Sequence, residues 1–89
     1  MPRFYFDVGE GERFTPDEDG LEFDDLGVAE YEAACTAAEI GRDRLPKGEA
    51  RDVTMEVRNE HHQRVLTIRV SMEVHRVNPP PEPSRRGRA

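Results

Sequence analysis

The sequence predicts a single two-layer α+β domain. One helix is expected to pack on one face of a mainly antiparallel sheet of three or four strands, in the order β(β)αββ. Apolar and polar residues alternate over residues 64–77, RVLTIRVSMEVHRV, and over residues 2–8, PRFYFDV. This period of two is typical of strands with one buried face. Residues 24–45 carry alanines at helical spacing, which predicts the helix that covers the sheet.

The C-terminal alternation is the most regular pattern in the chain, and it predicts one long strand from Arg64 to Val77. Polar residues occupy the odd positions from Thr67 to His75. The even positions are all apolar, namely Leu66, Ile68, Val70, Met72 and Val74. We therefore expect this apolar row to face the helix and the polar row to face water.

A second half-buried strand is predicted at the N-terminus, from Pro2 to Val8, with Phe4, Phe6 and Val8 on its inner face. Residues 13–15 can form a short returning strand before a proline ends it. Residues 17–20 read as a tight turn in which Gly20 is available for a positive φ. Residues 21–23 then have room for one further extended step with two inward residues.

The helix is predicted to begin near Asp24 and Asp25, whose side chains can cap the first free amides, and to run to about Leu45. Pro46 and Gly48 end it. Its inner side is nearly all small, so the large core side chains are expected to come from the strands. That side comprises Leu26, Ala33, Ala34, Ala37, Ala38, Ile40, Gly41 and Leu45.

Residues 51–59 form the predicted third strand, joined to the long strand by the loop 60–63, a length typical of a β-hairpin. We expect residues 1–77 to make up the domain. Residues 78–89 are rich in proline and arginine and are expected to be a disordered tail.

Composition and charge limit the classes of function. The chain has 89 residues, 36% of them charged, and a net charge of −6. A domain of this size has a thin core, and oligomerisation is a common way to add buried area. From Asp7 to Glu32 there are eleven acidic residues and one basic residue, so we do not expect this part of the chain to bind nucleic acid.

Cellular location follows from cysteine usage and hydropathy. The single cysteine, Cys35, excludes an intramolecular disulfide and fits a reducing compartment. No charged and apolar leader follows Met1, and no apolar run approaches the roughly 18 residues of a membrane span. The sequence therefore predicts a cytoplasmic protein without a membrane segment.

No arrangement of residues indicates reaction chemistry, so no catalytic residue, metal ligand or cofactor is predicted. His61 and His62 are adjacent in a turn, and no Cys or His follows at ligand spacing. The stretch around Asp17 and Gly20 resembles a calcium loop, but positions one and twelve of that loop are Thr15 and Leu26. We therefore expect a protein that is not an enzyme.

The outward sheet face is the most promising surface in the sequence. We expect a non-catalytic protein-interaction or regulatory module that acts as a homodimer, through this face or through an unpaired strand edge. The predicted interaction surface consists of Arg3, Tyr5, Arg58, Arg69 and His75.

Two alternatives stay open. A cleft between the Gly9–Phe23 loop and the start of the helix would suit a small-ligand-binding protein or an enzyme. The arginines of the tail would give weak, salt-sensitive binding to nucleic acid; they are Arg85, Arg86 and Arg88.

The opening residues MPRFYFDV, the turn and strand DGLE at 19–22 and the helix start at Asp25-Leu26 resemble a known family. It comprises short, uncharacterised bacterial proteins, a domain of unknown function, that begin MPR, two aromatic residues and FDV. The resemblance covers residues 1 to about 77 and implies the same fold outline, without site residues. A looser likeness is to HicB-type antitoxin modules, which implies an antitoxin-like partner-binding protein.

Overall fold

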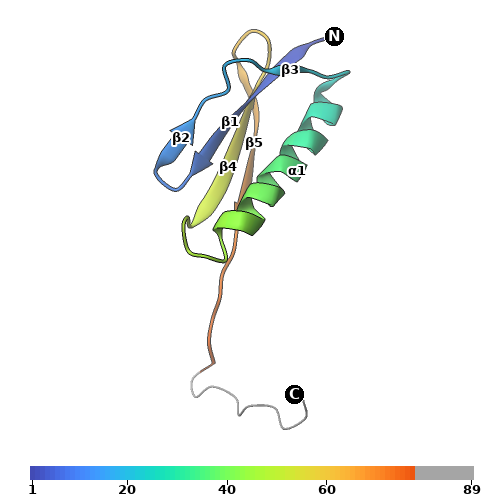
Figure 1. The fold of residues 1–89 in the computed structure, drawn as a ribbon. Helices are drawn as coiled ribbons and strands as arrows, with labels where there is room; N and C mark the ends of the chain where they lie inside the picture. Colours follow the sequence, from blue (N-terminus) through green and yellow to red (C-terminus); the bar gives the residue numbers. More distant parts are fainter. Residues whose placement is uncertain (78–89) are drawn as a thin grey trace.

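A computed structural model describes residues 1–77 of the chain (Figure 1). The predicted tail, residues 78–89, lies outside the described residues. Within residues 1–77, one helix and a five-stranded antiparallel sheet confirm the predicted α+β class and element order. The elements are β1 (Arg3–Glu10), β2 (Arg13–Thr15), β3 (Leu21–Glu22), α1 (Leu26–Arg44), β4 (Asp52–Arg58) and β5 (Arg64–Ser71).

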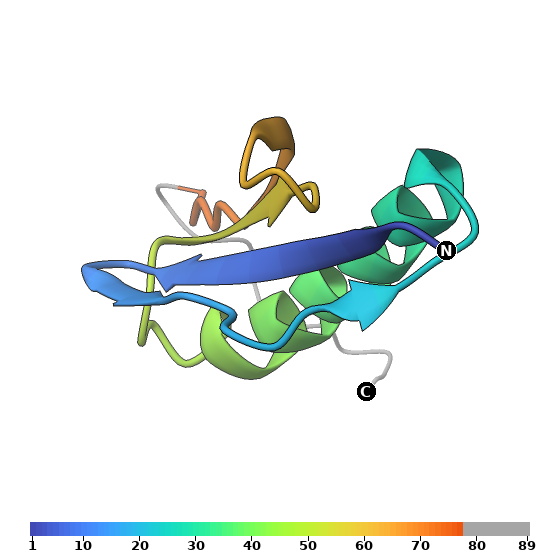
Figure 2. The same ribbon diagram turned by 90° about the horizontal axis from the view of Figure 1, so that it is seen from above.

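The sheet has the order β2-β1-β4-β5, and β3 also pairs with β1. Two short strands share one edge of β1, as Figure 2 shows, because β2 pairs at Val8 to Glu10 and β3 pairs at Arg3 and Phe4. The sheet therefore has more strands than the three or four predicted. The expectation of two inward residues at 21–23 was wrong, because Leu21 is 62% exposed while Phe23 packs against the core.

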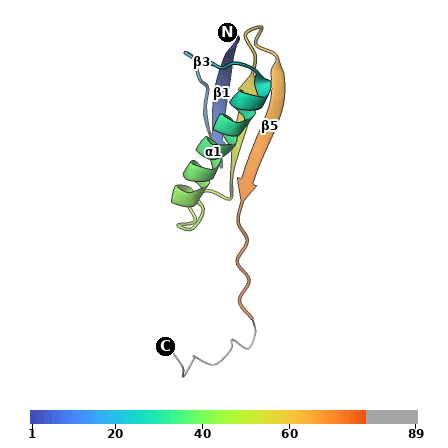
Figure 3. The ribbon, with the colours of Figure 1, turned by 90° about the vertical axis from the view of Figure 1, so that its right-hand side faces the viewer.

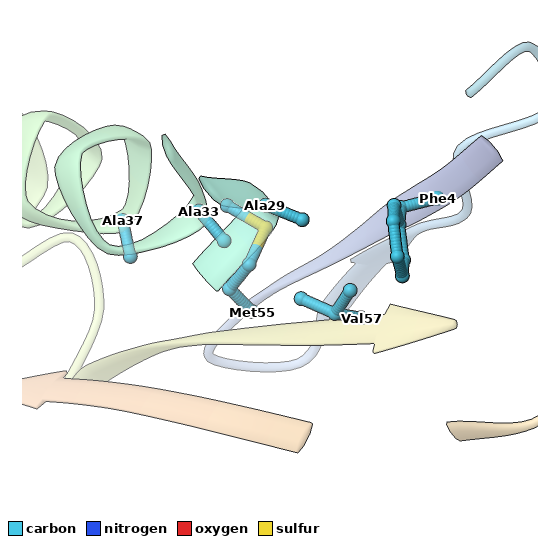
Figure 4. Close-up of a cluster of buried hydrophobic side chains, with 6 residues drawn as sticks. All are labelled: Phe4, Ala29, Ala33, Ala37, Met55 and Val57. Carbon is cyan, nitrogen blue, oxygen red and sulfur yellow. The ribbon is translucent and has the colours of Figure 1, made fainter. Parts of the chain in front are cut away.

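Helix α1 lies over β4 and β5 and is buried at every fourth residue, at Ala29, Ala33, Ala37 and Gly41. Small side chains let the helix approach the sheet, and β4 supplies the large fully buried ones, Val53, Met55 and Val57. Figure 4 shows Met55 and Val57 beneath the alanines of the helix. The buried row is narrower than predicted. Ala34 and Ala38 are exposed, as is Leu26 at 39%, because only one narrow line of residues along the helix meets the sheet.

The predicted helix start is confirmed. Asp25 is the N-cap, and its Oδ1 accepts a hydrogen bond from the amide of Val28 at 2.9 Å. The helix ends before Leu45, the C-cap.

Strand β5 is shorter than predicted. Its last residue, Ser71, pairs with the first residue of β4, Asp52, so β4 offers no partner beyond that point. Met72 and Val74 were expected in the buried row, but they are 44% and 75% exposed. Figure 3 shows the chain after β5 leaving the sheet and passing beyond the end of the helix.

Candidate interaction surface

The face of the sheet that points away from α1 carries polar side chains from three strands, and Figure 3 shows the helix on the opposite face only. Strand register assigns the residues to this face, because directly paired residues project on the same side of a sheet. We call it the polar face; it comprises Arg3, Tyr5, Asp7, Thr54, Glu56, Arg58, Arg64, Thr67 and Arg69.

Arg58 and Asp7 form the central ion pair of the polar face. Arg58 Nε donates to Asp7 Oδ2 at 2.7 Å, and Nη2 donates to Oδ1 at 3.0 Å. Asp7 is only 5% exposed. The hydrogen bond from Arg58 lowers the pKa of the Asp7 carboxyl below its ordinary value; burial opposes this effect, and a bond from the Asp17 amide adds to it. Pairing with the Arg58 guanidinium thus offsets the free-energy cost of burying the Asp7 carboxylate.

Asp17 binds the edge of β1 in the gap between β2 and β3. Its Oδ2 accepts the amide of Phe6 at 3.0 Å, and its own amide donates to Asp7 Oδ1 at 2.9 Å. Desolvation raises the pKa of Asp17, but hydrogen bonds from backbone amides outweigh it and hold that pKa below its ordinary value. The Asp17 carbonyl accepts from Arg58 Nη2 at 3.0 Å. One carboxylate therefore replaces the strand that is missing opposite Phe6.

The turn after Asp17 is built around a glycine. Gly20 has a φ of +71°, as the sequence predicted, and its amide donates to Asp17 Oδ1 at 3.1 Å. A Cβ at this position would lie 2.9 Å from the carbonyl oxygen of Phe4. Arg3 Nη1 donates to the Asp19 carbonyl at 2.8 Å. The turn is thereby held against β1.

Tyr5 lies beside two nitrogen-bearing side chains. The guanidinium carbon of Arg58 lies 4.9 Å from the centre of the Tyr5 ring, and the ring centres of Tyr5 and His62 are 5.3 Å apart. Arg58 Nη1 donates to His62 Nδ1 at 2.8 Å. A guanidinium can only donate, so Nδ1 accepts and the proton of a neutral His62 is on Nε2. We call Tyr5, Arg58 and His62 the stack.

Each arginine of the polar face has a carboxylate partner. Besides Arg58, the pairs are Arg3 with Glu22 at 3.5 Å, Arg64 with Glu56 at 3.1 Å, and Arg69 with Asp52 at 4.0 Å. A site for phosphate groups presents arginines with free donors. Together with Glu22 and Asp52 at its margins, the two carboxylates of this face equal its four arginines in number.

The structure brings together only part of the predicted surface. Arg3, Tyr5 and Arg58 are neighbours at one end of the polar face, and Arg69 lies on the same face opposite Thr54. His75 lies beyond the end of β5 beside Glu73, with its Nε2 3.3 Å from Glu73 Oε1.

Sequence reasoning missed the roles of Asp7, Asp17 and His62. Asp7 was assigned to the solvent side of its strand and Asp17 to a turn. A short-range signal existed only for Asp17, because an aspartate three residues before a glycine is a common turn-capping pattern.

The described residues also contain a hollow of about 380 Å³, lined by Glu10, Arg13, Arg44 and Glu49. It borders the predicted Gly9–Phe23 loop but lies near the end of the helix, whereas the sequence predicted a cleft near its start. Arg44 pairs with Glu10 at 3.0 Å and with Glu49 at 2.9 Å. Ligand pockets are mostly apolar, so this charged lining is atypical of one.

A family model described as Domain of unknown function (DUF6894) matches residues 3–71. The match agrees with the resemblance drawn from the opening residues and the turn. No curated protein and no solved structure matches the chain, and the looser HicB likeness stays a prediction. Within residues 1–77, α1 is not apolar enough along its length to cross a membrane.

Proposed function

We propose, from the premise that this chain belongs to the DUF6894 family, that it is a small cytoplasmic interaction or regulatory module. In this proposal the domain is not an enzyme, acts as a homodimer, and binds a partner protein through the polar face. Its cytoplasmic location is supported by the single cysteine.

The observation that carries the proposal is the stack. Tyrosine and arginine are enriched among the residues that dominate binding energy at protein interfaces. Here both are held in place before any partner arrives, because Asp7 and the Asp17 carbonyl fix the guanidinium that lies against Tyr5. A side chain that is already ordered loses less entropy on binding.

The homodimer is supported by the small core and by the position of β5. Only eight hydrophobic residues of the described chain are buried: Phe4, Ala29, Ala33, Ala37, Leu45, Val53, Met55 and Val57. Within residues 1–77, β5 ends the sheet with no strand on its outer side. A free edge with unpaired backbone groups is a natural contact for another chain.

Photo-crosslinking in the native host tests the polar face. A photoreactive residue replaces Thr54, at the middle of this face, and a control replaces Ala38, exposed on the helix. We expect a discrete adduct with another protein from position 54 only, lost when Tyr5→Ala is added. Adducts that persist with Tyr5→Ala, or that form equally from position 38, would contradict the proposal.

Light scattering coupled to gel filtration tests the homodimer. We expect twice the mass of one chain at high micromolar concentration. A strict monomer under these conditions would overturn this half of the proposal.

The hollow supports a second candidate, a small-ligand-binding protein. Arg13 lines it beside Glu10 and Glu49 and has no carboxylate within 4.0 Å in the described part of the chain, so the candidate ligand is a small anion that pairs with Arg13. A thermal-shift screen with citrate and inorganic phosphate tests this candidate. A rise in melting temperature that Arg13→Gln removes would favour it. In the antitoxin-like alternative, the partner protein that binds the polar face is a toxin.

A further inference from the structure

The strand pattern of the sequence continues beyond the strand in the structure. Apolar and polar residues alternate from Leu66 to His75, yet β5 ends at Ser71. The following residues include three exposed large apolar side chains, Met72 at 44%, Val74 at 75% and Val77 at 64%. Alternation of this kind signals a strand with one covered face, but within the described residues nothing covers it.

The outer edge of β5 itself is also unpaired within the described residues. Figure 1 shows β5 at the margin of the sheet, with the chain after it running on in nearly the same direction. Backbone donors and acceptors on that edge have no strand partner among residues 1–77. An eight-residue open edge on a half-buried strand is a template for pairing.

We propose that two copies of this chain pair through residues 65–77 as antiparallel strands, with a two-fold axis at Ser71. The inference rests on the proposed homodimer and specifies which surface forms it. Residues 72–77 of each copy lie along the outer edge of β5 of the other copy, so both sheets join into one.

Two inner-face residues of β5 meet apolar partners in this register, while Leu66 lies opposite Arg76 of the second copy. In an antiparallel pair centred on Ser71, Val70 lies opposite Met72 of the second copy, and Ile68 lies opposite Val74. Both pairs fall on the helix side of the sheet, where Val70 already contacts the helix near Gly41. The side chains of Met72 and Val74, exposed in the single chain, thereby pack against apolar side chains of the second copy, as the alternating pattern predicts.

Charged residues select this register over its neighbours. With Ser71 at the axis, Arg69 lies opposite Glu73 of the second copy, and the pair occurs twice. A shift of one residue in one strand places apolar residues opposite polar ones. Centring on Val70 instead puts Arg69 opposite Ser71, and centring on Met72 puts Arg69 opposite His75. Only the Ser71 register among these gives the two opposite-charge pairs.

Charge reversal tests the register. Glu73→Arg places like charges opposite each other twice, and we expect the dimer dissociation constant to rise at least about tenfold in sedimentation equilibrium. The double variant Arg69→Glu with Glu73→Arg restores opposite charges and should recover most of the loss. Glu60→Arg, the same change of charge in the exposed β4 to β5 loop, is the control and should leave the constant unchanged.

Cysteine cross-linking tests the axis in a Cys35→Ala background. Ser71→Cys brings two thiols opposite each other, within the Cα separation that a disulfide spans. We expect rapid formation of a covalent dimer under mild oxidation. Thr67→Cys, exposed on the same strand, places the two thiols about 27 Å apart along the strands and should form a covalent dimer only at the slow rate of random collision.

The two tests separate this inference from the proposed function. The protein can be dimeric by light scattering while the double charge reversal gives no recovery and both cysteine variants cross-link slowly. That combination would overturn the β5 pairing and leave the proposed homodimer unaffected. A strict monomer would overturn both.

Discussion

Asp7 and Arg58 lie 51 positions apart in the sequence and share two hydrogen bonds across adjacent strands, with the shorter one 2.7 Å long. The pair also holds the turn at residues 17–20, because the Asp17 amide donates to the Asp7 carboxylate and the Asp17 carbonyl accepts from the Arg58 guanidinium. One ion pair therefore connects the first strand, the fourth strand and the loop between β2 and β3. The stack on the polar face depends on the same guanidinium.

Asp7→Asn should lower the free energy of unfolding by about 2 to 4 kcal/mol, because it removes the charge partner of a largely enclosed guanidinium. Urea denaturation monitored by circular dichroism measures this loss. The control is Glu56→Gln on the same face, whose partner Arg64 is 64% exposed in its side chain, so we expect a loss below about 1 kcal/mol. Equal losses in the two variants would contradict the central role of Asp7.

Acid should destabilise the protein through Asp7 and Asp17. Both carboxyls have a folded-state pKa below their ordinary value of 3.8. At a pH between the folded-state and the unfolded-state pKa, the unfolded chain binds more protons than the folded chain. The stabilisation by these two carboxylates is therefore complete above about pH 4 and is lost as the pH falls through the folded-state pKa. Thermal unfolding from pH 7 to pH 2 measures the effect. Asp7→Asn should show a shallower acid dependence, and an unchanged slope would contradict the assignment.

Gly20→Ala should destabilise the domain by about 2 to 4 kcal/mol. The new Cβ combines a φ of +71° with contacts of 2.9 Å to backbone and ring atoms of β1. Gly48→Ala separates the two causes, since Gly48 has a φ of +75° but nothing within 4 Å of the added carbon. We expect it to cost only about 1 kcal/mol. Comparable melting temperatures for the two variants would show that the steric contact is unimportant.

Gly41→Ala should be destabilising by about 1 to 3 kcal/mol, against the usual gain of about 1 kcal/mol for this change in a helix. Its Cβ would lie 2.9 Å from Cγ1 of Val70, so helix and sheet would have to separate. Gly27→Ala meets only one side-chain atom, the capping Oδ1 of Asp25 at 3.3 Å, which has to move by no more than a few tenths of an ångström. This control should stay within about 0.5 kcal/mol of the wild type or exceed it. Chemical denaturation compares them, and a stabilised Gly41→Ala would contradict close packing there.

Local patterns in the sequence determined the elements and the inner faces of the strands at 2–8 and 51–59. The alternation in residues 2–8 and 51–59, the small residues at helical spacing and the aspartates before Leu26 each express an interaction within a few positions of the chain. The α+β class, the element order, the helix cap and the positive φ of Gly20 could therefore be predicted. Even the long strand was recognised correctly as far as Ser71.

Only the tertiary structure decided what depends on register and on partners. Asp7 meets Arg58 because β1 and β4 pair in one register, and the side chains of a strand carry no signal of which distant residue lies opposite. The end of β5 is set by the first residue of β4, so periodicity alone overestimated its length. Side-chain period is a local property of the backbone, whereas hydrogen-bond partners and burial are supplied by segments far away in sequence.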